Sequence, residues 1–278
     1  MQVTEYPSAK EFLDVTRELL MENEAANGLL LSYAERQIQG IQLAMSTKFY
    51  LVEEQGQPLL PAMFTPGVVP LLSDGPEKAA QLLARFFYPK HPQPAGVSGP
   101  KDTVLAFVEE WEHLTHCDLE IQSNLRIYIC KSVEQVKFPA GSHRNATHND
   151  FDLVKGWREV FKEEVGGIVL VNDKVIRSQI DEGKIHLWVT DQPVSHALFG
   201  GETGNGGMIS AVYTPPEHRN NGYASAVTSA ATQAILDSGK KYVILYTDLD
   251  NPTSNSIYQQ IGYTPIMDST LWRFKPAI

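Results

Sequence analysis

A segment in the last third of the chain joins an expected strand to an expected helix through a loop of small and polar residues. The strand, Met208–Thr214, ends at Pro215 and Pro216, because proline cannot continue a strand ladder. The first backbone N–H groups of a helix have no partner inside it, and the helix dipole is positive there, so the helix start favours an anion. Gly222 permits close backbone approach, and Arg219 has a forked donor. The segment predicts a diphosphate-binding loop.

The residues expected to contact this diphosphate are Arg219, Asn220, Asn221, Gly222, Tyr223, Ala224 and Ser225. On the loop alone, an ordinary strand-to-helix connection with an Asn-Asn-Gly turn explains the sequence equally well.

A second segment, Asn251–Tyr263, places a tyrosine on a short expected helix that follows the expected strand Tyr242–Thr247 in the sequence. The phenol of Tyr258 is a donor at neutral pH, because the ordinary pKa of tyrosine is about 10. The alternative for Tyr258 is a half-buried aromatic residue without a chemical role.

Together these segments resemble two signatures of the GNAT superfamily of N-acetyltransferases. Arg219–Ala224 matches R/Q-x-x-G-x-G/A, and Asn251–Tyr263 resembles N-x-x-(S/A)-x-x-x-Y-x-x-x-G-(F/Y). The resemblance implies acetyl-CoA as co-substrate, no metal, and direct attack by a primary amine in a ternary complex. It covers about residues 140–278, and the two signatures stand at the separation expected for the family.

The resemblance also implies roles for individual residues. The loop amides would hold the pyrophosphate, and Tyr258 would protonate the departing thiolate. Backbone amides near Val212 could polarise the thioester carbonyl. Val212, Tyr213 and Thr214 look like the family's splayed strand, whose backbone pairs with the pantetheine arm. Asn251 or Asn255 would bond to the pantetheine or to its neighbouring backbone.

The general base stays open in the sequence. Glu202, Asp248 and Asp250 lie near expected strand ends, on the side where the two signatures converge. Each is more simply a solvated loop carboxylate, and a water chain could serve instead. Two other features are weak evidence for a metal site or a dinucleotide-binding loop. His113, His116 and Cys117 do not form a four-ligand zinc pattern, and Gly204–Gly207 lies between two strands, as a hairpin turn does.

Periodicity predicts alternating strands and helices in both halves, and thus an α/β or α+β protein with a mixed sheet. We expect a duplicated, acetyltransferase-like fold, with a mostly antiparallel sheet flanked by helices in each half. The first half, residues 1–137, would be a degenerate domain without its own cofactor loop, and residues 138–278 the catalytic domain. The segment Pro89–Pro100 is expected to be a loop, and Ala62–Pro66 echoes Ala211–Pro215.

Composition narrows the classes of binding partner. The formal charge of −10 disfavours nucleic acid and would suit a cationic amine, although solubility alone explains it more simply. No long apolar run, no signal-like N-terminus and only two cysteines are present, so we expect a cytoplasmic protein without a membrane segment.

The acceptor, a small-molecule or peptide amine, cannot be identified from the sequence, and neither can the oligomeric state. Three rival functions remain: a non-catalytic CoA-binding sensor, transfer of a longer acyl group, and an unrelated nucleotide-binding protein.

Overall fold

The computed structural model describes residues 1–40, 47–91, 94–134, 137–165 and 172–275. The chain forms two compact units that are not contiguous in sequence. Unit 1 contains residues 1–127, 248–250 and 266–278, and unit 2 contains residues 128–247 and 251–265. The expected domain boundary near residue 137 falls in the connection between two strands, Asp118–Cys130 and Ser142–Asn145.

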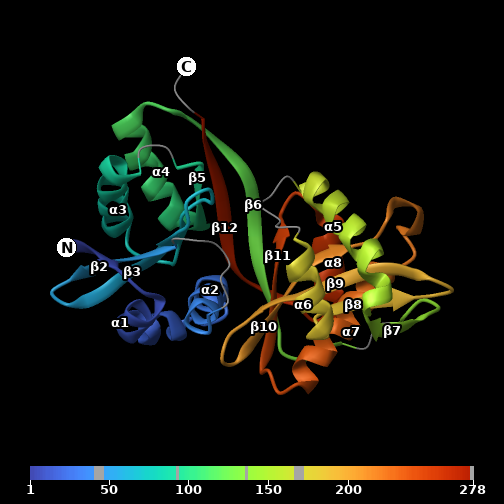
Figure 1. The fold of residues 1–278 in the computed structure, drawn as a ribbon. Coiled ribbons are helices and arrows are strands. Elements are labelled where there is room, and N and C mark those ends of the chain that lie inside the picture. The colour runs from blue at the N-terminus through green and yellow to red at the C-terminus, as the bar shows by residue number, and fades with distance from the viewer. Residues whose placement is uncertain (41–46, 92–93, 135–136, 166–171, 276–278) are drawn as a thin grey trace. The chain divides into compact units, whose positions relative to one another are not determined.

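The two halves of the chain repeat one order of elements, strand–helix–helix–three strands–helix–strand–helix–strand (Figure 1). The first copy is β1 (Gln2–Tyr6), α1 (Ala9–Glu22), α2 (Gly28–Ile38), β2 (Lys48–Glu54), β3 (Gln57–Phe64), β4 (Leu71–Leu72), α3 (Glu77–Lys90), β5 (Gly96–Pro100), α4 (Lys101–Thr115) and β6 (Asp118–Cys130). The second copy is β7 (Ser142–Asn145), α5 (Phe151–Val165), α6 (Asp173–Asp181), β8 (Ile185–Val189), β9 (Pro193–Glu202), β10 (Gly206–Tyr213), α7 (Tyr223–Asp237), β11 (Tyr242–Asp248), α8 (Pro252–Ile261) and β12 (Thr264–Lys275). The predicted duplication is present.

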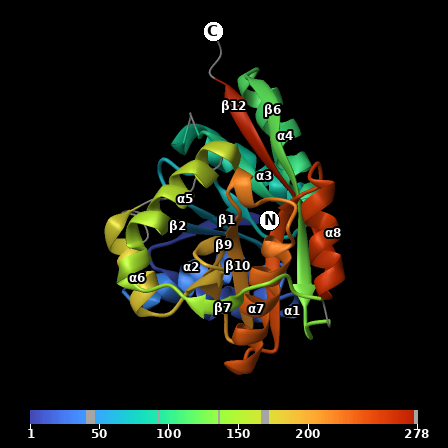
Figure 2. The same ribbon diagram turned by 90° about the vertical axis from the view of Figure 1, so that its right-hand side faces the viewer.

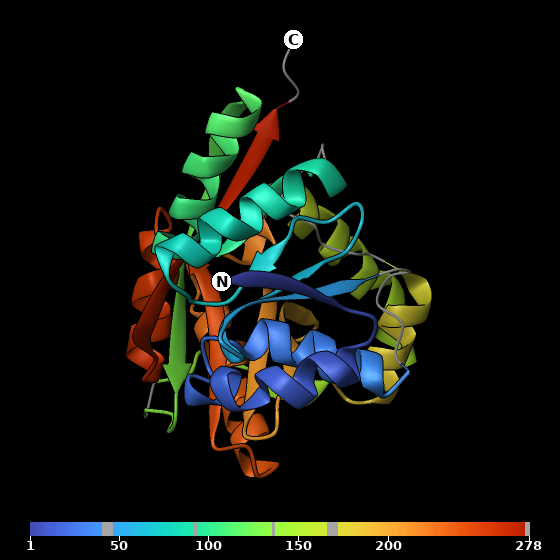
Figure 3. The ribbon, with the colours of Figure 1, turned by 90° about the vertical axis from the view of Figure 1, so that its left-hand side faces the viewer.

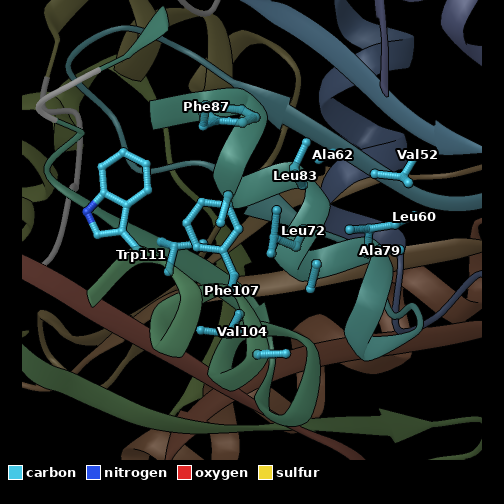
Figure 4. Packing of buried hydrophobic residues seen from close by; sticks show 14 of the residues in the cluster. Val52, Leu60, Ala62, Leu72, Ala79, Leu83, Phe87, Val104, Phe107 and Trp111 are labelled. Atoms are coloured by element: carbon cyan, nitrogen blue, oxygen red, sulfur yellow. The ribbon is translucent and has the colours of Figure 1, made fainter. Parts of the chain in front are cut away.

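Unit 1 has strands in the order β1-β2-β3-β4-β5-β12. Among the described pairings of these strands, only that of β4 with β5 is parallel, and the others are antiparallel. Helices α1 and α2 cover one face of these strands and α3 and α4 the other (Figure 3). On the α3–α4 side, Phe107 and Trp111 stack and pack over side chains from β2, β3 and β4 (Figure 4). This unit therefore has a buried core on each face of its strands.

Strand β12 comes from the end of the chain but completes the sheet of unit 1. It pairs antiparallel with β5, from Ser269 opposite Pro100 to Arg273 opposite Gly96. The ring of Phe274 stacks on Trp111, with the ring centroids 5.5 Å apart. The last strand of the second copy thus occupies the place beside the fifth strand of the first copy.

In unit 2 the strand order is β6-β11-β10-β9-β8-β7. Of the registers described from β11 to β7, that of β10 with β11 is parallel and the others are antiparallel. Helices α5 and α6 pack on one face and α7 and α8 on the other (Figure 2). The predicted class, a mixed fold with mostly antiparallel strands flanked by helices in each half, is confirmed.

Several sequence predictions need correction. The expected loop 89–100 contains the end of α3 and all of β5. The glycines of β5 are required by close packing, since a Cβ on Gly96 would lie 1.9 Å from the carbonyl oxygen of Trp272. Helices α2 and α6 were not predicted. The Ala62–Pro66 echo is misleading, because Ala62 lies in β3, the third strand of its copy, whereas Ala211 lies in β10, the fourth.

Within the described residues, no helix has both the length and the apolar character that a membrane crossing requires.

Candidate cofactor and acyl-transfer site

Strands β10 and β11 separate in the middle of unit 2. Their parallel ladder pairs Gly206 with Tyr242, Gly207 with Val243 and Met208 with Ile244, and it extends no further in the described register. Both strands continue, to Tyr213 and Asp248. The backbone of residues 209–213 therefore has one edge that is not paired with β11, and this edge is where the sequence placed a splayed strand.

A bulge in β10 lies within this unpaired stretch. Between the pairs Ser210–Leu198 and Tyr213–His196, β10 has one residue more than β9. Ala211 takes up the extra residue with φ of +47°, a backbone conformation that alanine rarely adopts. A bulge redirects the neighbouring N–H groups away from the regular ladder direction. The bulge therefore affects the backbone next to Val212, where the oxyanion contact was expected.

The end of β10 is held by Ser195 of β9. The Ser195 hydroxyl donates to the carbonyl oxygen of Tyr213 at 3.0 Å and lies 2.8 Å from the hydroxyl of Thr214. Ser195 is fully buried, so these bonds are shielded from water. They fix the two residues that lead into Pro215 and the loop.

Helix α7 starts without a cap. Its N-cap residue is Gly222, no side chain in the described parts of the chain accepts from the first turn, and no acidic residue lies in that turn. The N–H groups of Tyr223, Ala224 and Ser225 have no acceptor inside the helix, because the first such bond runs from Ala226 to Gly222. These amides and the helix dipole make this helix start suited to an anion.

Gly222 is required here by backbone conformation. Its φ is +78°, and the nearest protein atom to an added Cβ would be Cδ of Pro139 at 3.9 Å. Asn220 also has positive φ, +65°. The Asn221 amide group donates to the carbonyl oxygens of His218 and Arg219, which stabilises the turn. Space beside Gly222 is thus open.

Arg219 points its guanidinium group toward helix α5. Nη2 lies 2.8 and 2.9 Å from the two carboxylate oxygens of Glu164, and Nε donates to the Thr214 carbonyl oxygen at 3.0 Å. The forked donor that the sequence assigned to a phosphate is therefore engaged by a carboxylate in this structure. Both side chains are about two-fifths exposed (43% and 41%), so the pair contributes little stability.

Asn251 and Asn255 organise the start of α8. Asn251 is its N-cap, and its side-chain oxygen accepts from the Ser254 N–H at 3.0 Å. The Asn255 amide group donates to the Asn251 carbonyl oxygen, and its oxygen accepts from the Tyr128 hydroxyl at 3.2 Å. Both residues thus make backbone or β6 contacts, which fits the alternative in which they position neighbouring backbone.

Tyr258 lies one turn beyond Asn255 on α8 and is buried, with 8% of its surface exposed. Its ring makes an edge contact with Tyr263, with the ring centroids 6.0 Å apart. Burial raises the pKa of Tyr258 to about 12. The phenol therefore stays protonated at neutral pH, as a donor must. It is also a weaker acid than free tyrosine, so a hydrogen bond to a thiolate is favoured over early proton transfer.

The three carboxylates considered as general base have different surroundings. Glu202 forms ion pairs with Lys240 and Lys184 near the hairpin turn Thr203–Gly206. It pairs with Gly207, at the opposite end of β10 from Val212, about 17 Å away at a strand's rise per residue. Its expected position near the converging motifs is wrong. Asp248 ends β11 and accepts the N–H of Asp250, and both cluster with unit 1.

The sequence did not single out His196, which is paired with Tyr213 in the β9–β10 ladder. Its ring is 1% exposed, stacks on Trp157 at 5.6 Å, and has no hydrogen-bond partner on either nitrogen among the described residues. Burial, with a smaller effect of Arg158, lowers the pKa of His196 to about 3. Neither Glu164 nor His196 has a local sequence signal, because each meets its partner through the fold.

Unit 1 contains the equivalent connection, between β4 and α3, and it is built differently. Only residues 73–76 join these elements, and the cap position is Pro76. The first turn of α3 carries Glu77, a carboxylate where unit 2 has Tyr223. The Gly75 N–H is already bonded to the Thr103 hydroxyl at 3.1 Å. A short, acidic connection does not favour a diphosphate.

The match to a family model lies in the part of the chain that carries the candidate site. Residues 191–273, which include both signatures, match the model of a family described as FR47-like protein. A mycothiol acetyltransferase of Arthrobacter sp. (strain FB24) is 36% identical over 58 residues, which are 21% of this chain and 18% of that protein. The aligned segment thus spans less than one fifth of this relative.

Solved structures share the fold over nearly the whole chain. A GCN5-related N-acetyltransferase from Sphaerobacter thermophilus has a TM-score of 0.65 at 16% identity, covering 99% of this chain and 97% of its own. A tandem GNAT protein from the clavulanic acid biosynthesis pathway has a TM-score of 0.59 at 13% identity, covering 100% of both chains. With the family match, these likenesses confirm the resemblance to GNAT acetyltransferases and the tandem arrangement of the fold.

Proposed function

We propose that this chain, with its tandem GNAT fold, transfers an acetyl group from acetyl-CoA to a primary amine, and that residues 138–278 are its catalytic domain. The main support is the uncapped start of α7 directly after the splayed strand β10. The corresponding connection of unit 1 is short and acidic, so the chain itself provides the contrast. Val212, Tyr213 and Thr214 would contact the pantetheine arm with their backbone.

In the proposed reaction the amine attacks the thioester directly in a ternary complex. The amide groups at the β10 bulge would stabilise the oxyanion, because their direction is fixed by the fold before the substrate binds. The phenol of Tyr258 would donate a hydrogen bond and then a proton to the leaving thiolate. The attacking amine must lose its own proton, and none of the three carboxylates considered is assigned to that step.

The cofactor site is tested by a charge in the first turn of α7. Ser225→Glu places a carboxylate where the pyrophosphate would lie, but an acidic residue at a helix start stabilises the helix itself. We expect acetyl-CoA to bind Ser225→Glu at least about tenfold more weakly, a loss of about 1.4 kcal/mol. The unfolding temperature should be unchanged or higher.

Ser225→Gln is the matched control, with similar size and no charge, and it should bind nearly as the parent protein does. Isothermal titration with acetyl-CoA measures both variants. Equal affinity for acetyl-CoA in all three proteins would show that the pyrophosphate does not bind at this helix start. Binding that follows the prediction, without release of CoA in the presence of any amine, would favour the CoA-binding sensor.

A further inference from the structure

A cavity of about 680 Å³ lies beside α7, within unit 2. One wall is a face of α7 from Ser229 to Asp237, and the others come from the connection after β6 and from β7 and β8. None of the residues expected to contact acetyl-CoA lines it. Ser229 is seven residues beyond Gly222, which is about 10 Å along a helix. The cavity is therefore separate from the predicted cofactor loop.

The apolar part of the cavity contains two aromatic rings. Phe138 and Trp188 face each other at an angle of 43°, with their ring centroids 5.5 Å apart. Trp188 is fixed in place, because it is almost fully buried and its indole N–H donates to the Ala140 carbonyl oxygen at 3.2 Å. Aromatic faces attract both apolar groups and cations. The methyl groups of Ala230 and Ala234 extend this apolar surface.

The polar part is acidic and contains an unsatisfied hydroxyl. Glu134 and Asp237 line the cavity, and no lysine or arginine is among its described lining residues. Ser229 also lines it, is 1% exposed, and has a hydroxyl oxygen with no hydrogen-bond partner in the described parts of the chain. Buried hydroxyls are nearly always bonded, so this oxygen indicates a missing polar partner.

The remaining titratable group of the cavity does not oppose a cation. His143 lies 2.9 Å from His186, measured from Nε2 to Nδ1. Burial lowers the pKa of His143, so its ring is neutral at pH 7. The charge that lines the cavity at neutral pH is thus that of two carboxylates.

We propose that this cavity binds a small organic cation with an apolar body, of the arylalkylamine class, independently of acetyl-CoA. The ring or alkyl part would lie against Phe138 and Trp188. The ammonium group would lie toward Glu134 and Asp237. This site is additional to the acceptor position at the thioester.

The probe is 2-phenylethylamine, titrated into the full chain at pH 7 without acetyl-CoA. We expect a Kd below about 1 mM for a ligand of this size. Two analogues of similar shape are the controls: 2-phenylethanol, which is neutral, should bind more weakly, and 3-phenylpropionate, which is anionic, should not bind. No binding of the amine by folded protein, or equal binding of amine and alcohol, would overturn the proposal.

Two variants locate the binding. Ala234→Phe fills the cavity and should abolish binding of 2-phenylethylamine. The double change Glu134→Gln and Asp237→Asn alters exposed side chains, should leave the fold intact, and should weaken binding at least about threefold. Asp191→Asn removes an exposed carboxylate that does not line the cavity and should have no effect. Unchanged binding in the folded variants would place the amine elsewhere, including the acceptor site, and would also overturn the proposal.

Discussion

Tyr258 shows how one side chain can be both part of a core and a candidate acid. It belongs to the buried cluster under α7 and α8, so its replacement tests packing as well as chemistry. Tyr258→Phe keeps the ring and removes only the hydroxyl. We expect kcat for acetyl transfer to fall by about 100-fold, with the Kd for acetyl-CoA changed less than about twofold. Steady-state kinetics and titration calorimetry separate the two quantities, and an unchanged kcat would move the proton donor to another group.

The buried histidines lead to a second prediction at the residue scale, which concerns how the free energy of unfolding depends on pH. Burial, and to a smaller extent His143, lowers the pKa of His186 to about 4, and the pKa of His196 is also lowered. A folded pKa below the unfolded value of about 6.5 means that the folded state resists protonation. The stabilisation is present above pH 6.5 and is lost as pH falls toward 4, on the order of 3 kcal/mol for His186.

Urea unfolding at pH 7 and pH 5, followed by circular dichroism, measures this loss. His196→Phe keeps the stack on Trp157 and removes one titrating group. Its free energy of unfolding should therefore fall less between the two pH values than that of the parent protein. An identical fall in both proteins would mean that His196 is hydrated or protonated in the folded state.

At the level of elements, the start of α7 depends on a left-handed residue. Gly222→Ala adds a methyl group into open space, so its cost is set by φ of +78° and should be about 1–2 kcal/mol. Gly156→Ala is the matched control, because Gly156 lies inside α5 with no atom near the added methyl group. That change should stabilise the protein by about 0.5–1 kcal/mol. In thermal unfolding, we expect Gly222→Ala to lower the unfolding temperature and Gly156→Ala to raise it. Equal shifts in the two variants would contradict a left-handed conformation at Gly222.

Local sequence predicted the elements whose signals are local. The strands expected at Met208–Thr214 and Tyr242–Thr247 occur as β10 and β11, with bounds that differ by at most two residues. Strand β5 was not predicted, because its glycines look like loop residues until β12 packs against them. The same limit applies to the candidate site. The loop and Tyr258 have motifs, whereas the contact of Arg219 with Glu164 joins residues 55 positions apart.

At the scale of the whole molecule, the compact units do not coincide with the two sequence copies of the fold. Residues 266–278 belong to unit 1, although they follow both GNAT-like signatures in the chain. Deleting them leaves β5 without its neighbour and removes Phe274 from Trp111. We expect the truncated protein to be cleaved by a protease first within residues 1–127. Limited proteolysis with mass mapping tests this, and first cleavage within residues 137–247 would contradict it.

The placement of β12 also has a consequence for synthesis. A ribosome makes the first copy of the fold before the second, and a domain generally folds once its own chain has emerged. Here one edge of β5 lacks its β12 partner until residues 269–273 have been translated, after all the other elements of the second copy. The nascent first copy must therefore wait with an open strand edge, which is a template for mispairing. A premature stop codon just before residue 266 would therefore damage the part of the protein that is made first.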